Sequence, residues 1–317
     1  MTFVQSLEHG ITVVDTGFVR ERFDASFLIV QDGRAAFVDT GTNFSVPRLL
    51  AALRLQSLDE RSVDWVIVTH VHLDHAGGAG LLMEHAPNAK LVVHPRGARH
   101  MIDPSALMQS ARAVYGDDVV RRDYGELRPV RPDRVMTTDD GTVVTLGGRE
   151  LRFIDSPGHA RHHHCVWDEA SRGWFTGDTF GLAYPELTTP LGPHVVPTTS
   201  PVQFDPVALH STIDPLVRAQ PDMLYVTHYG AVPFQERLAS QLLSQVDAMV
   251  AAARELENID DRHAMLKRAC ESIYLSELRR CGSRAADDVL HNVLETDIEL
   301  NAQGLGSWLD RLRRSAD

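Results

Sequence analysis

A dense group of metal-ligating residue types follows an apolar run in "VIVTHVHLDHAGG", residues 66–78. Four of these residues, His70, His72, Asp74 and His75, lie within six consecutive positions. Successive side chains of an extended segment alternate sides, so His70 and His72 can point the same way and chelate one ion. A turn into a following helix would bring Asp74 and His75 round to a second ion. Imidazole and carboxylate donors suit zinc, and also iron or manganese.

Four ligands in six positions cannot complete two metal sites, so the run is either a solvated, histidine-rich loop or half of a larger constellation. Three further residues of ligand type stand just after apolar runs: His159 after "RFIDSPG", Asp178 after "GWFTG" and His228 after "DMLYVT". Strand ends in one layer of a sheet converge on one edge, where open α/β sheets place their sites. These shared contexts favour the metal site over the loop.

The elements that must position these side chains are predicted from periodicity. The first sixty residues contain short β-branched or aromatic runs, and the Asp32-Gly33 pair between two of them predicts a hairpin. Strand and helix patterns then alternate, which is typical of a layered α/β domain. We expect this domain to span residues 1–233, with an inserted helical cap at about 96–125.

Two later segments depart from this alternation. A Pro/Thr-rich loop at roughly 184–204 lacks periodicity, so we expect it to form a pocket wall. Residues 234–317 carry apolar side chains at helical spacing, which predicts a helical C-terminal region. Its apolar faces could pack on the chain's own domain or form a homodimer.

Composition narrows the classes of partner. The 317 residues carry a formal net charge of −12, and an acidic chain without a basic run repels nucleic acid. No apolar stretch is long enough to span a bilayer, and "MTFVQSLEHG" lacks the pattern of a secretory signal. The three scattered cysteines suggest a reduced setting. We therefore expect a cytoplasmic protein that acts on a small molecule, without a nucleic-acid or membrane partner.

The ordered motifs "THVHLDHAGG", "DSPGHA", "FTGDTF" and "YVTHYG" resemble those of the metallo-β-lactamase superfamily over roughly residues 10–232. The resemblance implies an αββα sandwich and two divalent metal ions, with zinc favoured over iron or manganese. It implies that His70, His72 and His159 bind the first ion. It likewise assigns the second ion to Asp74, His75 and His228, with Asp178 bridging both. Asp39, in "AAFVDTG", would orient the histidine loop.

The same resemblance implies hydrolysis of an ester, thioester, lactone or phosphodiester by a metal-bridging hydroxide, with Asp74 also steering its proton. The run after Asp178 lacks the basic residue of glyoxalase II proteins, and Tyr184 lies later than the corresponding tyrosine of acyl-homoserine lactonases. The chain looks most like uncharacterised prokaryotic members. Two alternatives stay open: a mononuclear iron oxygenase resembling persulfide dioxygenases, and a regulatory or binding protein.

Three consecutive histidines, His162 to His164, open the strand that follows His159. Alternation would send His162 and His164 to one face and His163 to the other. One face could reach the metal cleft, so His163 and His164, together with Tyr184, are candidate substrate contacts. The alternative is that these histidines are ordinary strand residues whose polar atoms bond to backbone or solvent.

Overall fold

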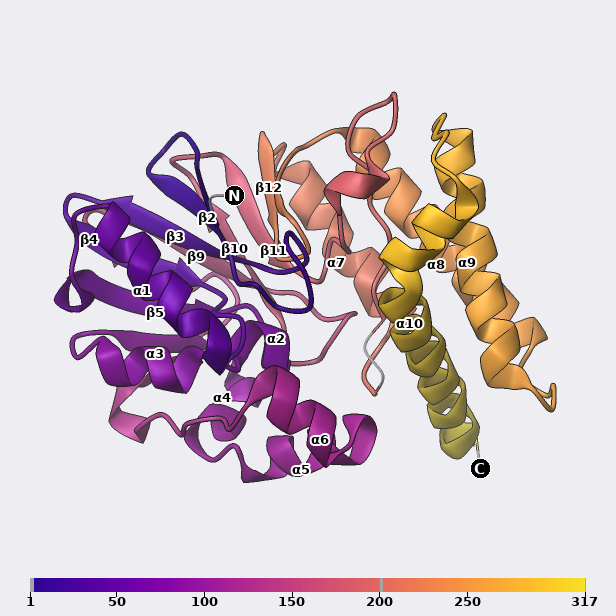
Figure 1. Ribbon diagram of the computed structural model, residues 1–317, viewed down its shortest axis with the longest axis horizontal. Coiled ribbons are helices and arrows are strands. Elements are labelled where there is room, and N and C mark those ends of the chain that lie inside the picture. Colours follow the sequence, from indigo (N-terminus) through magenta and orange to yellow (C-terminus); the bar gives the residue numbers. More distant parts are fainter. Residues whose placement is uncertain (1–2, 200–201, 317) are drawn as a thin grey trace. The chain divides into compact units, whose positions relative to one another are not determined.

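The computed structural model describes residues 3–199 and 202–316, which fall into two compact units (Figure 1). Unit 1 comprises Met1–Asp155, His162–Gly177 and Pro221–Ala231. Unit 2 comprises Ser156–Arg161, Asp178–Gln220 and Val232–Asp317. The predicted boundary near residue 233 stays a prediction, and the helical unit also takes in residues 178–220.

The described part of unit 1 contains a seven-stranded sheet whose strands follow chain order. The strands are β1 (Val4–Ser6), β2 (Ile11–Asp15), β3 (Ala25–Gln31), β4 (Arg34–Val38), β5 (Val63–Val68), β6 (Lys90–Val93) and β7 (Val135–Thr137). Neighbours from β1 to β4 are antiparallel, and those from β4 to β7 are parallel. The parallel strands β4 and β5 therefore end at the same edge, where Asp39 and Thr69 follow them.

The predicted hairpin lies between β3 and β4, where Gln31 pairs with Arg34. Asp32 has a φ of 48° and Gly33 a φ of 74°. A two-residue loop whose two central residues have positive φ matches the twist of the flanking strands, and Asp-Gly is a preferred sequence for it. The structure confirms this prediction.

Alternation divides the side chains of the first sheet between two cores. Phe27 and Ile29 pack in one core with Phe153 and Phe175 of the second sheet. Leu28 lies in the other core, where α1 (Val46–Leu55) and α3 (Ala79–His85) cover the outer face of the first sheet (Figure 1). Burial on both faces explains why these strands read as nearly continuous apolar runs.

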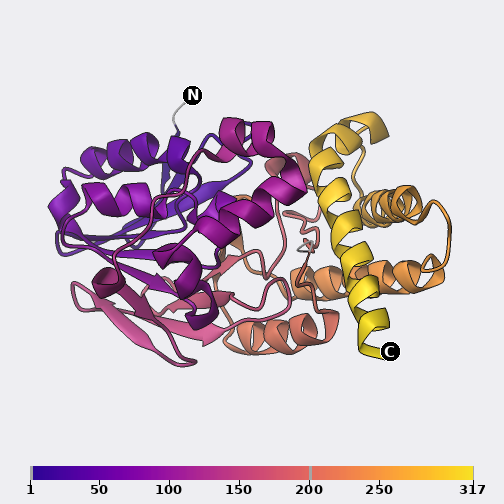
Figure 2. The ribbon, with the colours of Figure 1, turned by 90° about the horizontal axis from the view of Figure 1, so that it is seen from below.

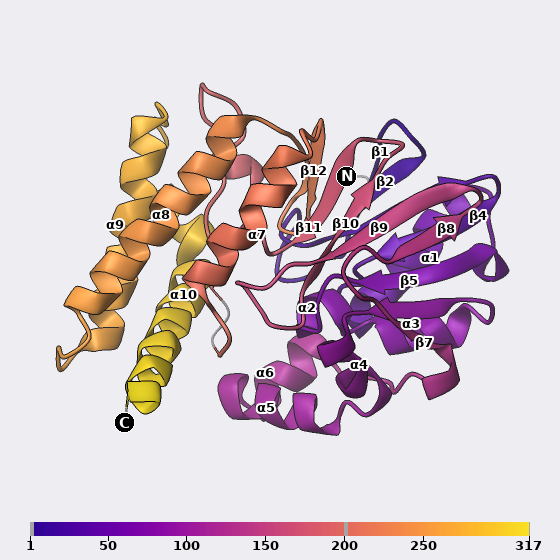
Figure 3. The same cartoon turned by 180° about the vertical axis from the view of Figure 1, so that it is seen from behind.

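The second sheet has the strand order β13-β12-β11-β10-β9-β8 (Figure 3). Its strands are β8 (Val143–Leu146), β9 (Arg149–Asp155), β10 (His164–Asp168), β11 (Gly173–Gly177), β12 (Met223–Val226) and β13 (Gly230–Pro233). Strands β11 and β12 are parallel, and Gly177 pairs with Val226. Both strands thus end at one edge, just before Asp178 in one case and Thr227 in the other.

The predicted cap consists of α4 (Pro95–Ile102), α5 (Ser105–Tyr115), α6 (Asp117–Val119) and a π-helical turn, Val120–Tyr124. Its buried apolar side chains include Met108, Ala111 and Val120. They pack in one cluster with Leu73, which begins α2 (Leu73–Ala76) inside the histidine motif. The cap therefore helps to fix the turn that carries Asp74 and His75.

Unit 2 is built from α7 (Pro206–Arg218), α8 (Glu236–Glu255), α9 (Arg262–Arg280) and α10 (Asp287–Ala316). Leu238, Leu242 and Val246 form a buried stripe on α8, and Leu266 and Tyr274 lie buried on α9. Figure 2 shows α10, in yellow, running across the orange helices α8 and α9. The helical prediction for this region is confirmed.

Shorter helical turns are Asn43–Ser45, Glu60–Ser62, Pro132–Arg134 and Pro185–Leu187. Within the ranges 3–199 and 202–316, no helix is both long enough and apolar enough to cross a bilayer. Ser200 and Pro201, in the loop expected to form a pocket wall, lie outside the described residues.

Candidate metal centre

The histidine motif begins where β5 ends and is held by the neighbouring strand end. The backbone N–H and the hydroxyl of Thr69 donate to Asp39 Oδ1 at 2.8 and 3.0 Å. Further along, the Thr40 N–H donates to the His75 carbonyl at 2.7 Å. These bonds join the loop after β4 to the motif and fix its conformation.

Asp74, His75 and His228 form one compact donor group inside unit 1. Their ligand atoms all lie within 4.8 Å of one another, and both histidines are buried. Asp74 Oδ2 lies 3.4 Å from His228 Nε2 and 3.8 Å from His75 Nε2. The structure therefore brings together, from distant parts of the chain, three residues that the family resemblance assigns to one ligand set.

The hydrogen bonds of the two imidazoles determine which nitrogen carries the proton. His75 Nδ1 lies 2.8 Å from Asp39 Oδ2, and His228 Nδ1 lies 2.9 Å from the Phe23 carbonyl. Both partners only accept, so each Nδ1 must carry a hydrogen and donate it. In the neutral form of each ring, Nε2 is therefore the nitrogen without a proton. Each Nε2 then holds a lone pair, as a metal ligand must.

The distances between the ligand atoms of Asp74, His75 and His228 suit binding to a shared ion better than hydrogen bonds between these residues. Protein N–H···O bonds measure about 2.7–3.2 Å. Two ligand atoms at about 2.0–2.2 Å from one tetrahedral ion lie roughly 3.3–3.6 Å apart. The observed 3.4 Å falls in the second range, and 3.8 Å lies just beyond it. The donor set therefore fits a divalent ion.

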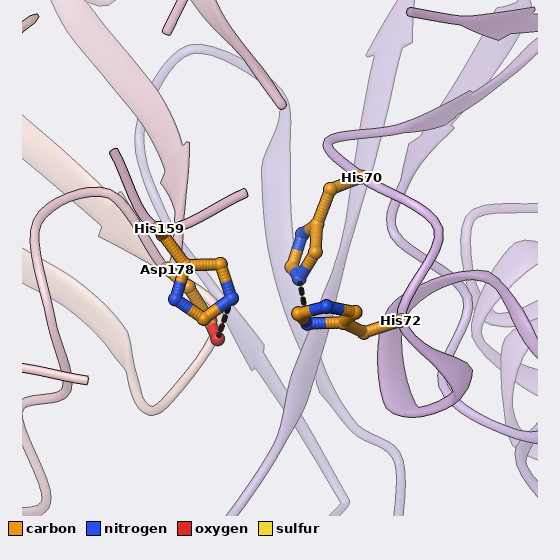
Figure 4. A group of neighbouring side chains, drawn as sticks. All are labelled: His70, His72, His159 and Asp178. Carbon is orange, nitrogen blue, oxygen red and sulfur yellow. Dashed lines mark hydrogen bonds and ion pairs between the residues drawn. The ribbon is translucent and has the colours of Figure 1, made fainter. Parts of the chain in front are cut away.

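The other predicted ligands form two pairs, each within its own unit (Figure 4). In unit 1, His70 Nε2 and His72 Nδ1 lie 2.8 Å apart. In unit 2, His159 Nε2 lies 3.3 Å from Asp178 Oδ2. The Nδ1 of His159 faces the Thr198 carbonyl at 3.4 Å, so the ring is again oriented with Nε2 towards a carboxylate.

Asp39 is hydrogen-bonded to the histidine motif, and its predicted role in orienting the motif stays a prediction. It is fully buried, and besides Thr69 and His75 it accepts a 2.8 Å hydrogen bond from the Thr227 hydroxyl. Thr69 and Thr227 were missed at the sequence level. The signal was present, because "VTH" occurs twice, at residues 68–70 and 226–228. In both copies the threonine donates to Asp39 and the next residue is a predicted ligand.

Gly177 allows β11 to end beside the histidine motif. Its φ is 47°, and a Cβ atom on it would lie 2.5 Å from His163 Nε2 and 2.5 Å from Thr69 Oγ1. Any other residue would therefore push apart the ends of β11 and β5. The tight approach explains the glycine directly before Asp178.

The predicted substrate contacts stay predictions, and the structure places each of them in buried surroundings. The His163 ring stacks on His70 with centroids 4.9 Å apart. His164 Nδ1 bonds to the Thr138 hydroxyl at 2.8 Å, and burial lowers the pKa of His164 to about 3, so this ring is neutral. Tyr184 lies in unit 2, where its hydroxyl donates to Asp297 at 3.3 Å.

We compared the sequence of this chain with family models and with known proteins. The family model described as "Metallo-beta-lactamase superfamily" matches residues 19–228. ST1585 from Sulfurisphaera tokodaii, a metallo-beta-lactamase fold-containing protein, is 28% identical over 59% of this chain and 69% of its own length. The acyl-coenzyme A thioesterases MBLAC2 of Gallus gallus and Homo sapiens are each 27% identical. They match 51% and 55% of this chain, which spans 61% and 64% of their lengths.

Solved structures show the shared fold. The crystal structure of ST1585 from Sulfolobus tokodaii covers 94% of this chain and 98% of its own, with a TM-score of 0.66 and 23% identity. TTHA1429 from Thermus thermophilus covers 87% of this chain and 92% of its own, with a TM-score of 0.58 and 20% identity. Since the family model matches well over half of the chain, this protein belongs to the metallo-beta-lactamase superfamily.

Proposed function

We propose that this chain is a metal-dependent hydrolase with two adjacent divalent-ion sites, most simply zinc sites. The second site is the donor group of unit 1 described above. The first site would take its ligands from both pairs of Figure 4, and Asp178 would serve both ions. The proposed ligands are His70, His72, His159 and Asp178 for the first ion, and Asp74, His75 and His228 for the second. The family resemblance adds Asp178 to the second set.

One observation carries this proposal: the imidazole rings of His75, His159 and His228 are oriented in the same way. Each ring directs Nδ1 at an oxygen acceptor and Nε2 at a carboxylate of the predicted ligand set. The N···O separations at Nε2 are 3.3–3.8 Å, beyond the usual range of about 2.7–3.2 Å for N–H···O hydrogen bonds. Solvated surface histidines would have no reason to repeat this arrangement three times.

Chain connectivity supports the first site. Asp178 directly follows Gly177, the last residue of β11, and consecutive Cα atoms lie about 3.8 Å apart. His159 lies only four residues after Asp155, which ends β9. Both ligands are therefore tethered closely to strand ends of unit 1.

Bound divalent ions would lower the pKa of a water molecule and polarise the carbonyl or phosphoryl oxygen of a substrate. Asp74 has the most exposed side chain of its donor group, at 23%, against 0% for His75 and 6% for His228. Its carboxylate can therefore reach solvent or substrate and accept a proton there. Asp39 and Phe23 act by keeping the imidazoles in one orientation and one protonation state.

An ester, thioester, lactone or phosphodiester is the proposed substrate class. The thioesterase names of the MBLAC2 relatives support testing acyl-coenzyme A thioesters first. A small-molecule substrate, a cytoplasmic setting and a homodimer formed through the helical C-terminal region, residues 234–317, belong to the same proposal.

The test is elemental analysis of purified protein beside a panel of these four substrate types. We expect close to two transition-metal ions per chain and turnover that His72→Ala abolishes. The matched control is His210→Ala, because His210 is exposed and pairs with Asp247 on the surface of unit 2. One iron ion with oxygen consumption would instead support the iron oxygenase, and bound metal without turnover would support a regulatory protein.

A further inference from the structure

Asp24 lies beside the second donor group, on a segment that is bound to the His228 segment on both sides. Phe23, just before it, accepts the His228 Nδ1–H through its carbonyl at 2.9 Å. Ala25, just after it, donates its N–H to the Thr227 carbonyl at 2.8 Å. Asp24 therefore has a fixed place next to one of the predicted ligands, although no motif of the sequence marks it.

The two carboxylate oxygens of Asp24 have different surroundings. The residue is fully buried, and Oδ2 accepts a hydrogen bond from the Thr16 hydroxyl at 2.8 Å. Oδ1 is buried and finds no hydrogen-bond donor among residues 3–199 and 202–316. A buried polar atom of this kind calls for an explanation, and an unassigned ion or water is a common one.

The ionisable groups that act on Asp24 connect it to the second donor group. Burial raises the pKa of Asp24 to about 7. His228 and His75 lower the pKa of Asp24, and Asp74 raises it. Asp24 thus interacts electrostatically with His228, His75 and Asp74, the three members of the second donor group. A divalent cation there would add the positive charge that a buried carboxylate otherwise lacks.

We propose that Asp24 is a positioning residue of the second metal site, where its carboxylate adds negative charge and Oδ1 accepts a hydrogen bond from a water on the ion. The inference rests on the proposed function, because it takes Asp74, His75 and His228 to bind an ion. Asp24 itself is not a ligand in this scheme. It acts through the water and through its charge, as outer residues of metal sites do.

The test is a zinc titration of metal-free protein against a chelating indicator, for wild type and for Asp24→Asn. We expect the wild type to bind two ions. Asp24→Asn should weaken one of the two by roughly 10- to 100-fold and leave the other within threefold. The cobalt-substituted protein should show the same change in the visible spectrum of one ion only.

Two matched variants separate charge from structure. Thr16→Val removes the bond to Oδ2 but keeps the carboxylate, so both ions should stay. Asp64→Asn removes a carboxylate of the same unit that pairs with Arg34, and should also change nothing at the metal sites. The metal-free Asp24→Asn protein should unfold at a denaturant concentration no lower than wild type, because the substitution removes a poorly satisfied buried charge. If Asp24→Asn does not fold, Asp24→Ser serves in the same titration.

The outcomes distinguish this inference from the function on which it rests. A wild-type protein that binds no second ion would overturn the proposed function itself. If the wild type binds two ions and Asp24→Asn keeps both at wild-type affinity, only the role of Asp24 is wrong. A metal-free variant that loses stability while keeping both affinities would show a merely structural residue, which also refutes the inference.

Discussion

The substitution Asp39→Asn should change the protonation state of His75 while preserving the shape of the site. The carboxylate accepts hydrogen bonds from Thr69, Thr227 and His75. The Thr69 N–H lies 2.8 Å from Oδ1 and can only donate, so the amide oxygen of the asparagine must take that place. The amide NH₂ then replaces Oδ2 and faces His75 Nδ1.

An NH₂ group at that place needs an acceptor. The His75 ring can supply one only by moving its proton from Nδ1 to Nε2, and a protonated Nε2 cannot bind a metal ion. Metal binding at the second site must then return the His75 proton from Nε2 to Nδ1. The Nδ1–H group then faces an N–H of the new amide, so that two donors oppose each other. We expect metal affinity there to fall by roughly 10- to 100-fold, which corresponds to about 1.4–2.7 kcal/mol.

The assay combines the zinc titration with ¹⁵N NMR of the histidine rings, which reports the protonated nitrogen. Thr227→Val is the matched control, because it removes a 2.8 Å bond to the same Oδ2 without imposing the other tautomer. Both variants should lose about 1–2 kcal/mol of stability, but only Asp39→Asn should lose metal. If Asp39→Asn keeps both ions within threefold and His75 keeps its Nδ1 proton, the orienting role of Asp39 is refuted.

Three other predictions concern the remaining ligand sets and unit 2. Asp178→Asn should keep the fold, weaken metal retention and lower turnover by at least ~100-fold, and a variant with both metals and near-full turnover would refute the bridging role. Burial lowers the pKa of His194 from 6.5 to about 4, so the unfolded chain binds more protons between these values and stability should fall by up to about 3 kcal/mol as the pH drops from 6.5 to 4. Urea unfolding at pH 7 and pH 4.5 measures this effect, and His194→Phe should reduce it. A truncation ending at Pro233 removes α8 to α10 and should aggregate in light scattering, whereas a monodisperse, fully active truncate would refute a role for these helices.

The ligand types and their order along the chain could be predicted from the sequence because they are local properties. His70, His72, Asp74 and His75 lie within six consecutive positions, so their spacing alone indicates chelation. The Asp32-Gly33 hairpin was predictable for the same reason, since two adjacent residues with positive φ specify the turn. The helical periodicity of α8 likewise depends only on neighbours three and four positions away.

The residues that orient these ligands could not be found in this way. Thr227 lies 188 residues from Asp39, and Phe23 lies 205 residues from His228, so no local pattern links the partners. The buried oxygen of Asp24 gives no signal at all in the sequence, because an aspartate before a strand is usually a turn residue. Side-chain types and local spacing thus determined which atoms could bind metal. Only the tertiary structure decided which nitrogen of each ring is free to do so, because that choice depends on hydrogen-bond acceptors that folding brings from distant parts of the chain.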